Sequence, residues 1–195
     1  DQIARIYNVE RVAATAGQNK VQLNAAYAET DFLRIFDLDF VAGDARSALD
    51  KPGSVVLTQE AARQLFGSQP ALGQRLLLNG DTDATVTGVI APVRQPSFMG
   101  TGQDAVLRFD MLREWSSSSQ GARLDDREVW TGLWPFTFVV LPPELSMYAF
   151  NARLLPFLDR RPDRHFVKRP RVIASFGAIG LGIVVLTYLG LRDSP

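Results

Sequence analysis

A strand, a helix cap, a helix and a helix stop follow one another within residues 54–67, and this unit constrains the fold more than any other segment. Ser54–Leu57 is a short apolar run that predicts a buried strand. Thr58 stands at an N-cap position, because its hydroxyl can accept a hydrogen bond from a free backbone N–H group. Residues 59–66 carry apolar side chains on one helical face, and Gly67 is placed to end the helix in the left-handed conformation. This order of elements predicts a fold that mixes strands with short helices.

Two stretches before this unit alternate between apolar and polar residues, as strands do. Ile3–Ala14 and Lys20–Ala28 therefore predict a hairpin-like pair. A short helix at Phe32–Phe36, capped by Thr30 or Asp31, is predicted next. Its side chains are too apolar to face water on all sides, so we expect it to dock onto a sheet.

A second hairpin is predicted after the helix stop. Gln74–Leu78 and Ala84–Ile90 have the pattern of strands, and they are joined across Asn79-Gly80, a dipeptide typical of tight hairpin turns. Gly88, inside the second run, indicates a bulge or a close approach of two backbones.

The second half of the chain has a weaker pattern. Prolines and glycines interrupt it, and the apolar run Leu107–Leu112 is brief. The four serines at 116–119 predict a mobile loop. Phe136–Leu141 predicts a strand, and Glu144–Leu158 predicts an amphipathic helix.

Together these elements predict a domain of the α+β class over residues 1–165. The domain would have two small subdomains, with strand and short-helix units of one subdomain at about 1–92 and 133–160 and a variable inserted region at about 93–132. A single apolar segment follows at 172–191.

Composition argues against several functions. Lysine plus arginine and aspartate plus glutamate each number 21, so the formal net charge is zero, whereas nucleic-acid binding usually leaves a basic excess. Cysteine is absent, and the one histidine, His165, lies in an arginine-rich segment. Nucleophilic triads and zinc or copper sites need more imidazole or thiolate than this. We therefore expect no catalytic residue, no metal and no cofactor.

Three tryptophans are the best candidates for contacts with a partner. Trp115, Trp130 and Trp134 can fill the core of a β-rich subdomain, form a protein-binding surface or stack on a small ligand. The sequence alone leaves these alternatives open.

The segment Val172–Leu191 contains 20 residues without a charge. As a helix it would span about 30 Å, the hydrocarbon thickness of a bilayer, and we predict a transmembrane helix here. Ala174, Ala178 and Gly182 would form a stripe of small residues for close helix contact. The alternative is a buried strand-turn-strand or a core helix. The basic run at 160–171 would by itself place the main domain on the cytoplasmic side, because positive charge normally stays there.

Specific motifs follow one another between Tyr27 and Val89. In chain order they are Ala28-Glu-Thr-Asp31-Phe32-Leu33; the set Phe36, Phe40 and Gly43; Val55-Val56-Leu57; the set Ala62, Leu65, Phe66 and Gly67; the set Pro70, Leu72, Gly73 and Gln74; and the set Val86, Gly88 and Val89. In this order the chain resembles the MacB/FtsX-type permeases of ATP-binding-cassette systems, in particular their MacB-like periplasmic core domain. The resemblance covers about residues 20–160. Asp44 and Gln74 depart from it, since many members have arginine and lysine there.

The resemblance implies a mechanical, non-enzymatic function. The chain would belong to an inner-membrane permease of a bacterium, with its main domain in the periplasm. A separate cytoplasmic ATPase subunit would supply the motion, and the domain would act on a periplasmic adaptor, a lipoprotein or a substrate protein. Pairing with a second copy is a further expectation. The alternative is a stand-alone periplasmic interaction module that binds a partner through its tryptophan-bearing segment.

Overall fold

The computed structural model of the protein describes residues 3–93, 99, 107–117, 135–142, 144–146, 148–150, 152, 171–176 and 182–187. These residues form mainly β-sheet with short helices, which agrees with the α+β class. The strands are β1 (Ile3–Ala16), β2 (Asn19–Ala28), β3 (Phe40–Gly43), β4 (Ser54–Thr58), β5 (Arg75–Leu78), β6 (Thr82–Ile90), β7 (Met111–Glu114), β8 (Pro135–Val140), β9 (Arg171–Phe176) and β10 (Gly182–Thr187). The helices are α1 (Thr30–Phe36), α2 (Gln59–Phe66) and the 3-10 turn η1 (Trp115–Ser117).

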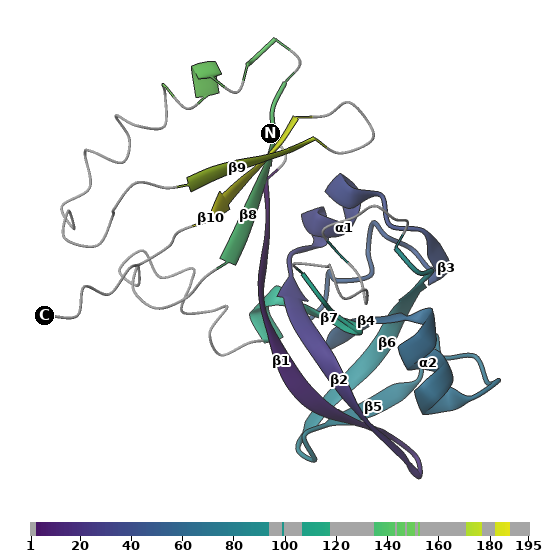
Figure 1. Ribbon diagram of the computed structural model, residues 1–195. Helices are drawn as coiled ribbons and strands as arrows, with labels where there is room; N and C mark the ends of the chain where they lie inside the picture. The colour runs from purple at the N-terminus through teal and green to yellow at the C-terminus, as the bar shows by residue number, and fades with distance from the viewer. Residues whose placement is uncertain are drawn as a thin grey trace, which may run out of the picture.

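The central feature of the described residues is a ring of strands that closes on itself. Its order is β1, β2, β7, β4, β6 and β5, and β5 pairs again with β1. We call this ring the closed sheet (Figure 1). Strand β3 pairs with the end of β6 beyond β5, and β8, β10 and β9 continue from the other half of β1. Figure 1 shows these last three strands extending away from the end where α2 lies.

Strand β1 belongs both to the closed sheet and to the extension formed by β8, β10 and β9. It pairs with β2 from Ile6 to Ala16, while its other edge pairs with β8 at Ile3–Tyr7 and with β5 at Ala14 and Thr15. A bulge between Tyr7 and Val9 inserts one extra residue against β2. One extra residue moves the side chains that follow it to the opposite face of the sheet. The apolar residues of β1 before the bulge and those after it therefore pack in two different cores.

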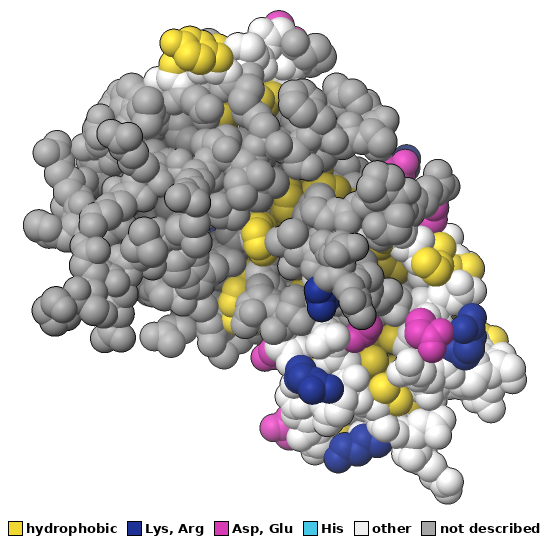
Figure 2. Space-filling view, viewed as in Figure 1, with side chains coloured by type: hydrophobic (Ala, Val, Ile, Leu, Met, Phe, Trp, Pro, Cys, Tyr) yellow, Lys and Arg dark blue, Asp and Glu magenta, His cyan; other side chains and the backbone are white. Residues whose placement is uncertain are grey.

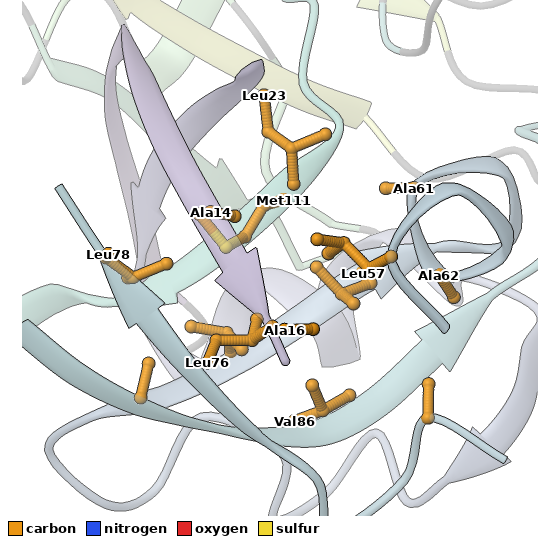
Figure 3. Packing of buried hydrophobic residues seen from close by; sticks show 14 of the residues in the cluster. Ala14, Ala16, Leu23, Leu57, Ala61, Ala62, Leu76, Leu78, Val86 and Met111 are labelled. Atoms are coloured by element: carbon orange, nitrogen blue, oxygen red, sulfur yellow. The ribbon is translucent and has the colours of Figure 1, made fainter. Parts of the chain in front are cut away.

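The first core fills the closed sheet. Leucine, valine and methionine side chains alternate with alanines, and α2 adds Ala61, Ala62 and Leu65 at one end (Figure 3). Figure 3 shows the labelled side chains from β1, β2, β4, β5, β6 and β7 directed toward one another. The alanines at 14, 16, 25 and 84 leave room for the larger side chains, because the interior of a small closed sheet is narrow.

The second core lies under α1. Phe32 and Leu33 are fully buried there, and Phe32 contacts the ring of Phe138 from β8 at 5.9 Å between centroids. Ile6 of β1 and Leu112 of β7 belong to the same core. The predicted docking of this apolar helix onto a sheet is therefore confirmed.

Local predictions in the first ninety residues are largely confirmed. Thr58 caps α2 by accepting a hydrogen bond from the Ala61 N–H at 3.3 Å, and the helix ends at Phe66. Gly67 has the expected positive φ of 63°, but its ψ of −120° lies outside the left-handed helical region. Asn79 and Gly80 both have positive φ, as a tight hairpin turn requires.

Other predictions differ from the structure. The N-cap of α1 is Glu29, not Thr30 or Asp31, and its side chain makes no capping bond. Ser116 and Ser117 belong to η1 and are hydrogen-bonded, so the mobile-loop prediction is wrong for these two residues. The interpretation of 93–132 as a variable insertion also misses strand β7, which lies between β2 and β4. The described strands form one continuous sheet joined through β1, and most of the predicted inserted region lies outside the described residues. Of the predicted helix at 144–158, residues 148–150 and 152 are helical.

The apolar tail is the clearest correction. Residues 171–176 and 182–187 are strands β9 and β10, which pair with each other, and β10 pairs with β8. The helix predicted over 172–191 is therefore not what the structure has there. Both runs are rich in β-branched residues, which favour strands, and the open edge of β8 supplies a partner for their backbone groups. No helix among the described residues is long and apolar enough to cross a membrane.

Two glycines allow β3 to lie close to β6. A Cβ on Gly88 would stand 2.5 Å from Cε1 of Phe40, and a Cβ on Gly43 would overlap the carbonyl oxygen of Thr87. The register between β4 and β6 also shifts next to Gly88. The prediction of a bulge or close backbone approach at Gly88 is thus confirmed.

We expect Gly43→Ala to lower the free energy of unfolding by about 3 kcal/mol or more, because a positive φ and a steric overlap coincide there. Gly17→Ala is the matched control. Gly17 also has a positive φ, but a Cβ at this turn would meet no atom within 4 Å, so about 1 kcal/mol is expected. Urea denaturation followed by tryptophan fluorescence measures both, and equal losses would contradict the close packing of β3 on β6.

Candidate functional site

A polar cluster lies next to the apolar interior of the closed sheet. Along β2, Tyr27 follows the interior residues Leu23 and Ala25 on the same face, and along β7 Arg113 follows Met111. The cluster therefore begins on the faces where the apolar core ends.

Three side chains from three strands form the centre of this cluster. The Arg113 guanidinium Nη1 donates to the Tyr27 hydroxyl at 2.6 Å and to the Glu10 carboxylate at 3.3 Å. The Tyr27 hydroxyl in turn donates to Glu10 Oε1 at 2.6 Å. The guanidinium also lies over the Tyr27 ring, 4.8 Å from its centroid. Arg113 is only 6% exposed, so its charge depends on these partners.

The surroundings of Tyr27 change its acidity. Burial raises the pKa of Tyr27 well above its ordinary value, and the hydrogen bond to Glu10 raises it further. Arg113 acts in the opposite direction, because its positive charge favours the phenolate. Since the first causes prevail, the phenol stays protonated and remains a hydrogen-bond donor to Glu10.

A second group extends the cluster toward the N-terminal half of β1. The ring of Tyr7 stacks on Tyr27 at 5.7 Å and meets Trp115 edge-on at 6.1 Å, both measured between centroids. Arg5 places its guanidinium 4.5 Å from the centroid of the Trp115 ring. Arg5 also forms an ion pair with Glu29, and its backbone N–H donates to the same carboxylate at 2.8 Å. Glu29 thus joins β1 to the start of α1.

The Glu114 carboxylate connects the cluster to the loop before β4. Glu114 accepts hydrogen bonds from the backbone N–H and hydroxyl groups of both Ser116 and Ser117 at 2.7–2.9 Å. Ser117 Oγ in turn accepts from the Gly53 N–H at 2.9 Å. The η1 turn is therefore held between β7 and β4.

The chemistry of this arrangement is structural. Each charged group at its centre has a charged or hydroxyl partner, and the bonds tie β1, β2 and β7 together. The described residues contain no group of three histidine, cysteine, aspartate or glutamate side chains that could hold a metal ion. The geometry suits a set of polar contacts that holds these three strands in a fixed arrangement.

Comparison with known proteins identifies the family. The family model for the MacB-like periplasmic core domain matches residues 1–156. The chain belongs to this family.

Solved structures have the same fold as this MacB-like domain. A domain described as part of a permease protein from Porphyromonas gingivalis has a TM-score of 0.66 at 19% identity, over 100% of this chain and 79% of that chain. The periplasmic region of MacB from Actinobacillus actinomycetemcomitans has a TM-score of 0.54 at 14% identity, over 80% and 65%. The extracellular domain of the noncanonic ABC-type transporter YknZ from Gram-positive bacteria has a TM-score of 0.50 at 14% identity, over 82% and 78%. No curated protein matches the chain.

The residues predicted as partner contacts fall in different places in this MacB-like domain. Trp115 is 5% exposed and belongs to the polar cluster, whereas Trp130 and Trp134 lie outside the described residues. Ala174 and Gly182 stand in β9 and β10, so they are not part of a helical stripe with Ala178, which is also outside the described residues.

Sequence reasoning missed the residues at the centre of the cluster. Arg113 stands two positions after Met111, at the end of an apolar run, so a strand would place it on the same face as Met111. A charged residue on a buried face needs partners, and this was the signal that could have identified it. Its partners come from β1 and β2, 103 and 86 positions away along the chain. No local pattern could connect them.

We expect Tyr27→Phe to lower the free energy of unfolding of the MacB-like domain by about 1–3 kcal/mol, because Arg113 loses its closest buried acceptor. Tyr148→Phe is the control, since Tyr148 is 86% exposed, and it should leave stability unchanged. Urea denaturation of both variants measures the difference. Equal stability of the wild type and Tyr27→Phe would mean that the cluster does not hold the strands.

Stability should also fall at high pH because of Tyr27. The folded-state pKa is raised, so the unfolded chain loses this proton first, and the contribution is complete below the ordinary tyrosine pKa of about 10 and lost above it. The loss of stability above about pH 10 should therefore be shallower in Tyr27→Phe than in the wild type. Urea midpoints measured from pH 8 to pH 11 test this, and parallel curves would contradict it.

Proposed function

We propose that the chain is the periplasmic domain of an inner-membrane ABC transporter permease, and that it passes ATPase-driven motion to a periplasmic partner or substrate. The observation that carries this proposal is the family match over residues 1–156, which names a periplasmic core domain. The fold shared with periplasmic and extracellular transporter domains supports it.

The architecture supports a mechanical function. A strand that is hydrogen-bonded on both edges resists sliding, because movement along its neighbours would break several bonds at once. Strand β1 has such bonding at two places, at Ile6 and Tyr7 between β2 and β8, and at Ala14 and Thr15 between β2 and β5. A displacement applied near Ile3 would therefore be transmitted to the closed sheet, because β1 runs into this sheet with no flexible linker between them.

The family match supports a proposal for the partners of this motion. A cytoplasmic ATPase subunit would drive the full-length permease, and the domain would act on an adaptor, a lipoprotein or a substrate protein, alone or as a homodimer. On the face drawn in Figure 2, basic and acidic side chains of the described residues are interspersed with hydrophobic ones. This mixture favours a partner recognised by shape over one drawn by a single sign of charge.

The alternative is a stand-alone interaction module that uses the tryptophan-bearing segment. Burial of Trp115 against Tyr7 and Arg5 argues against its part in such a surface, which leaves Trp130 and Trp134 as its candidates. Trp130→Ala with Trp134→Ala would weaken partner binding without unfolding the domain if this alternative held.

These 195 residues contain no cysteine, so single probes can be placed within the domain and tested in the full-length permease bound to its ATPase. Probes at Gln18→Cys and at the ATPase should change their separation when ATP is added, because the domain moves. Probes at Gln18→Cys and Asp81→Cys, both on turns of the closed sheet, should keep a constant separation because the sheet moves as one body. If the distance between Gln18→Cys and the ATPase did not change with ATP, the transfer of motion would be contradicted. If the distance between Gln18→Cys and Asp81→Cys changed, the rigidity of the closed sheet would be contradicted.

A further inference from the structure

A polar pocket opens on the side of the closed sheet away from its apolar interior. It is lined by the loop at 51–53, by Ser54 at the start of β4, by Arg75 of β5, and by residues 83–85 and Thr87 of β6. Asp83, Thr85 and Thr87 alternate with Ala84 and Val86, whose side chains belong to the interior core. The pocket therefore presents the polar face of β6, and none of its residues belongs to the cluster around Tyr27.

Ser54 is the unusual residue of this pocket. It is only 4% exposed, and its hydroxyl has no hydrogen-bond partner among the described residues. In the described part of the chain, the Trp115 indole nitrogen is the one side-chain polar atom that is both fully enclosed and without a partner. The Ser54 oxygen also lacks a partner, so it is not fully enclosed and keeps access to the pocket. Buried hydroxyls normally have a partner, so Ser54 offers an unused donor.

The charged residues of the pocket are also unpaired. Lys51, Arg75 and Asp83 are exposed, and none of them forms an ion pair with another described residue. Two positive charges and one negative charge thus border the unused serine hydroxyl. This set can bind an oxyanion and a neighbouring donor group together.

The backbone around the pocket is fixed in place. Gly53 donates its N–H to Ser117 Oγ at 2.9 Å, and its carbonyl oxygen accepts from the Thr85 N–H at 2.9 Å. Thr87 Oγ1 is within hydrogen-bonding distance of the carbonyl oxygens of Ala48 and Val55. A ligand would therefore meet a preformed site and would not have to order the loop.

We propose that this pocket binds a phosphate ester that carries an amine or hydroxyl group next to the phosphate. Lys51, Arg75 and the Ser54 hydroxyl bind the phosphate oxygens, and Asp83 accepts a hydrogen bond from the adjacent amine or hydroxyl. Two cations near one point favour phosphate, which carries more charge than a carboxylate. Such a group occurs in phospholipid headgroups and in soluble phosphate esters.

The proposal is tested by titrating the ¹⁵N-labelled chain of 195 residues with O-phosphoethanolamine and, separately, with inorganic phosphate. Saturable amide shifts are expected at Gly53, Ser54 and Thr85, with tighter binding of O-phosphoethanolamine. Lys51→Gln, Arg75→Gln and Ser54→Ala should each weaken both ligands by about tenfold, the effect of losing one bond to a charged group. Asp83→Asn should remove only the preference for O-phosphoethanolamine.

Arg63→Gln is the matched control, because Arg63 is an exposed arginine on α2 that is paired with Glu60. It should leave both affinities unchanged. Equal weakening by Arg63→Gln, or shifts that do not saturate, would overturn the proposal, since either result would mean unspecific charge attraction. Sedimentation with vesicles of phosphatidylethanolamine and phosphatidylcholine, lost in Lys51→Gln, would support a headgroup as the source. Binding of O-phosphoethanolamine without sedimentation would support a soluble ester.

Discussion

The structure depends on the hydrogen bonding of β1 along both of its edges. Pairing with β2 on one side and with β5 on the other closes the sheet, so the ring itself has no open edge. The narrow interior that results accepts leucine, valine and methionine only because alanines stand between them. The same strand continues to β8, so the closed sheet and the three-stranded extension share one backbone.

The polar cluster is placed where these two parts meet. Arg113 is buried between strands of the closed sheet, and Tyr27 and Glu10 give its charge the partners that burial demands. Arg5 and Glu29 make a similar connection between β1 and the start of α1. Such bonds are directional and resist shear more specifically than apolar contacts do, which suits the transfer of motion proposed for this domain.

Local features of the sequence predicted the first ninety residues well. The Thr58 cap, the end of α2 before Gly67, the Asn79-Gly80 turn and the close approach at Gly88 each depend on a few neighbouring residues, so a local pattern is sufficient to predict them. Strand β7 was missed because four residues carry too little periodicity, and its identity comes from neighbours on β2 and β4. The tail was misread because an apolar run of this length is compatible with a helix or with two strands, and only the partner strand β8 distinguishes them.

The sequence by itself determined the mixed strand and helix class, the family, and the boundaries of elements whose caps and turns are encoded within a few residues. The tertiary structure decided the closure of the sheet, the cluster around Arg113 and Tyr27, and the polar pocket beside Ser54. Each of these brings together residues that lie tens of positions apart, and the bulge in β1 sets which faces meet. Contacts of this kind arise from register and packing, which no short stretch of the chain specifies alone.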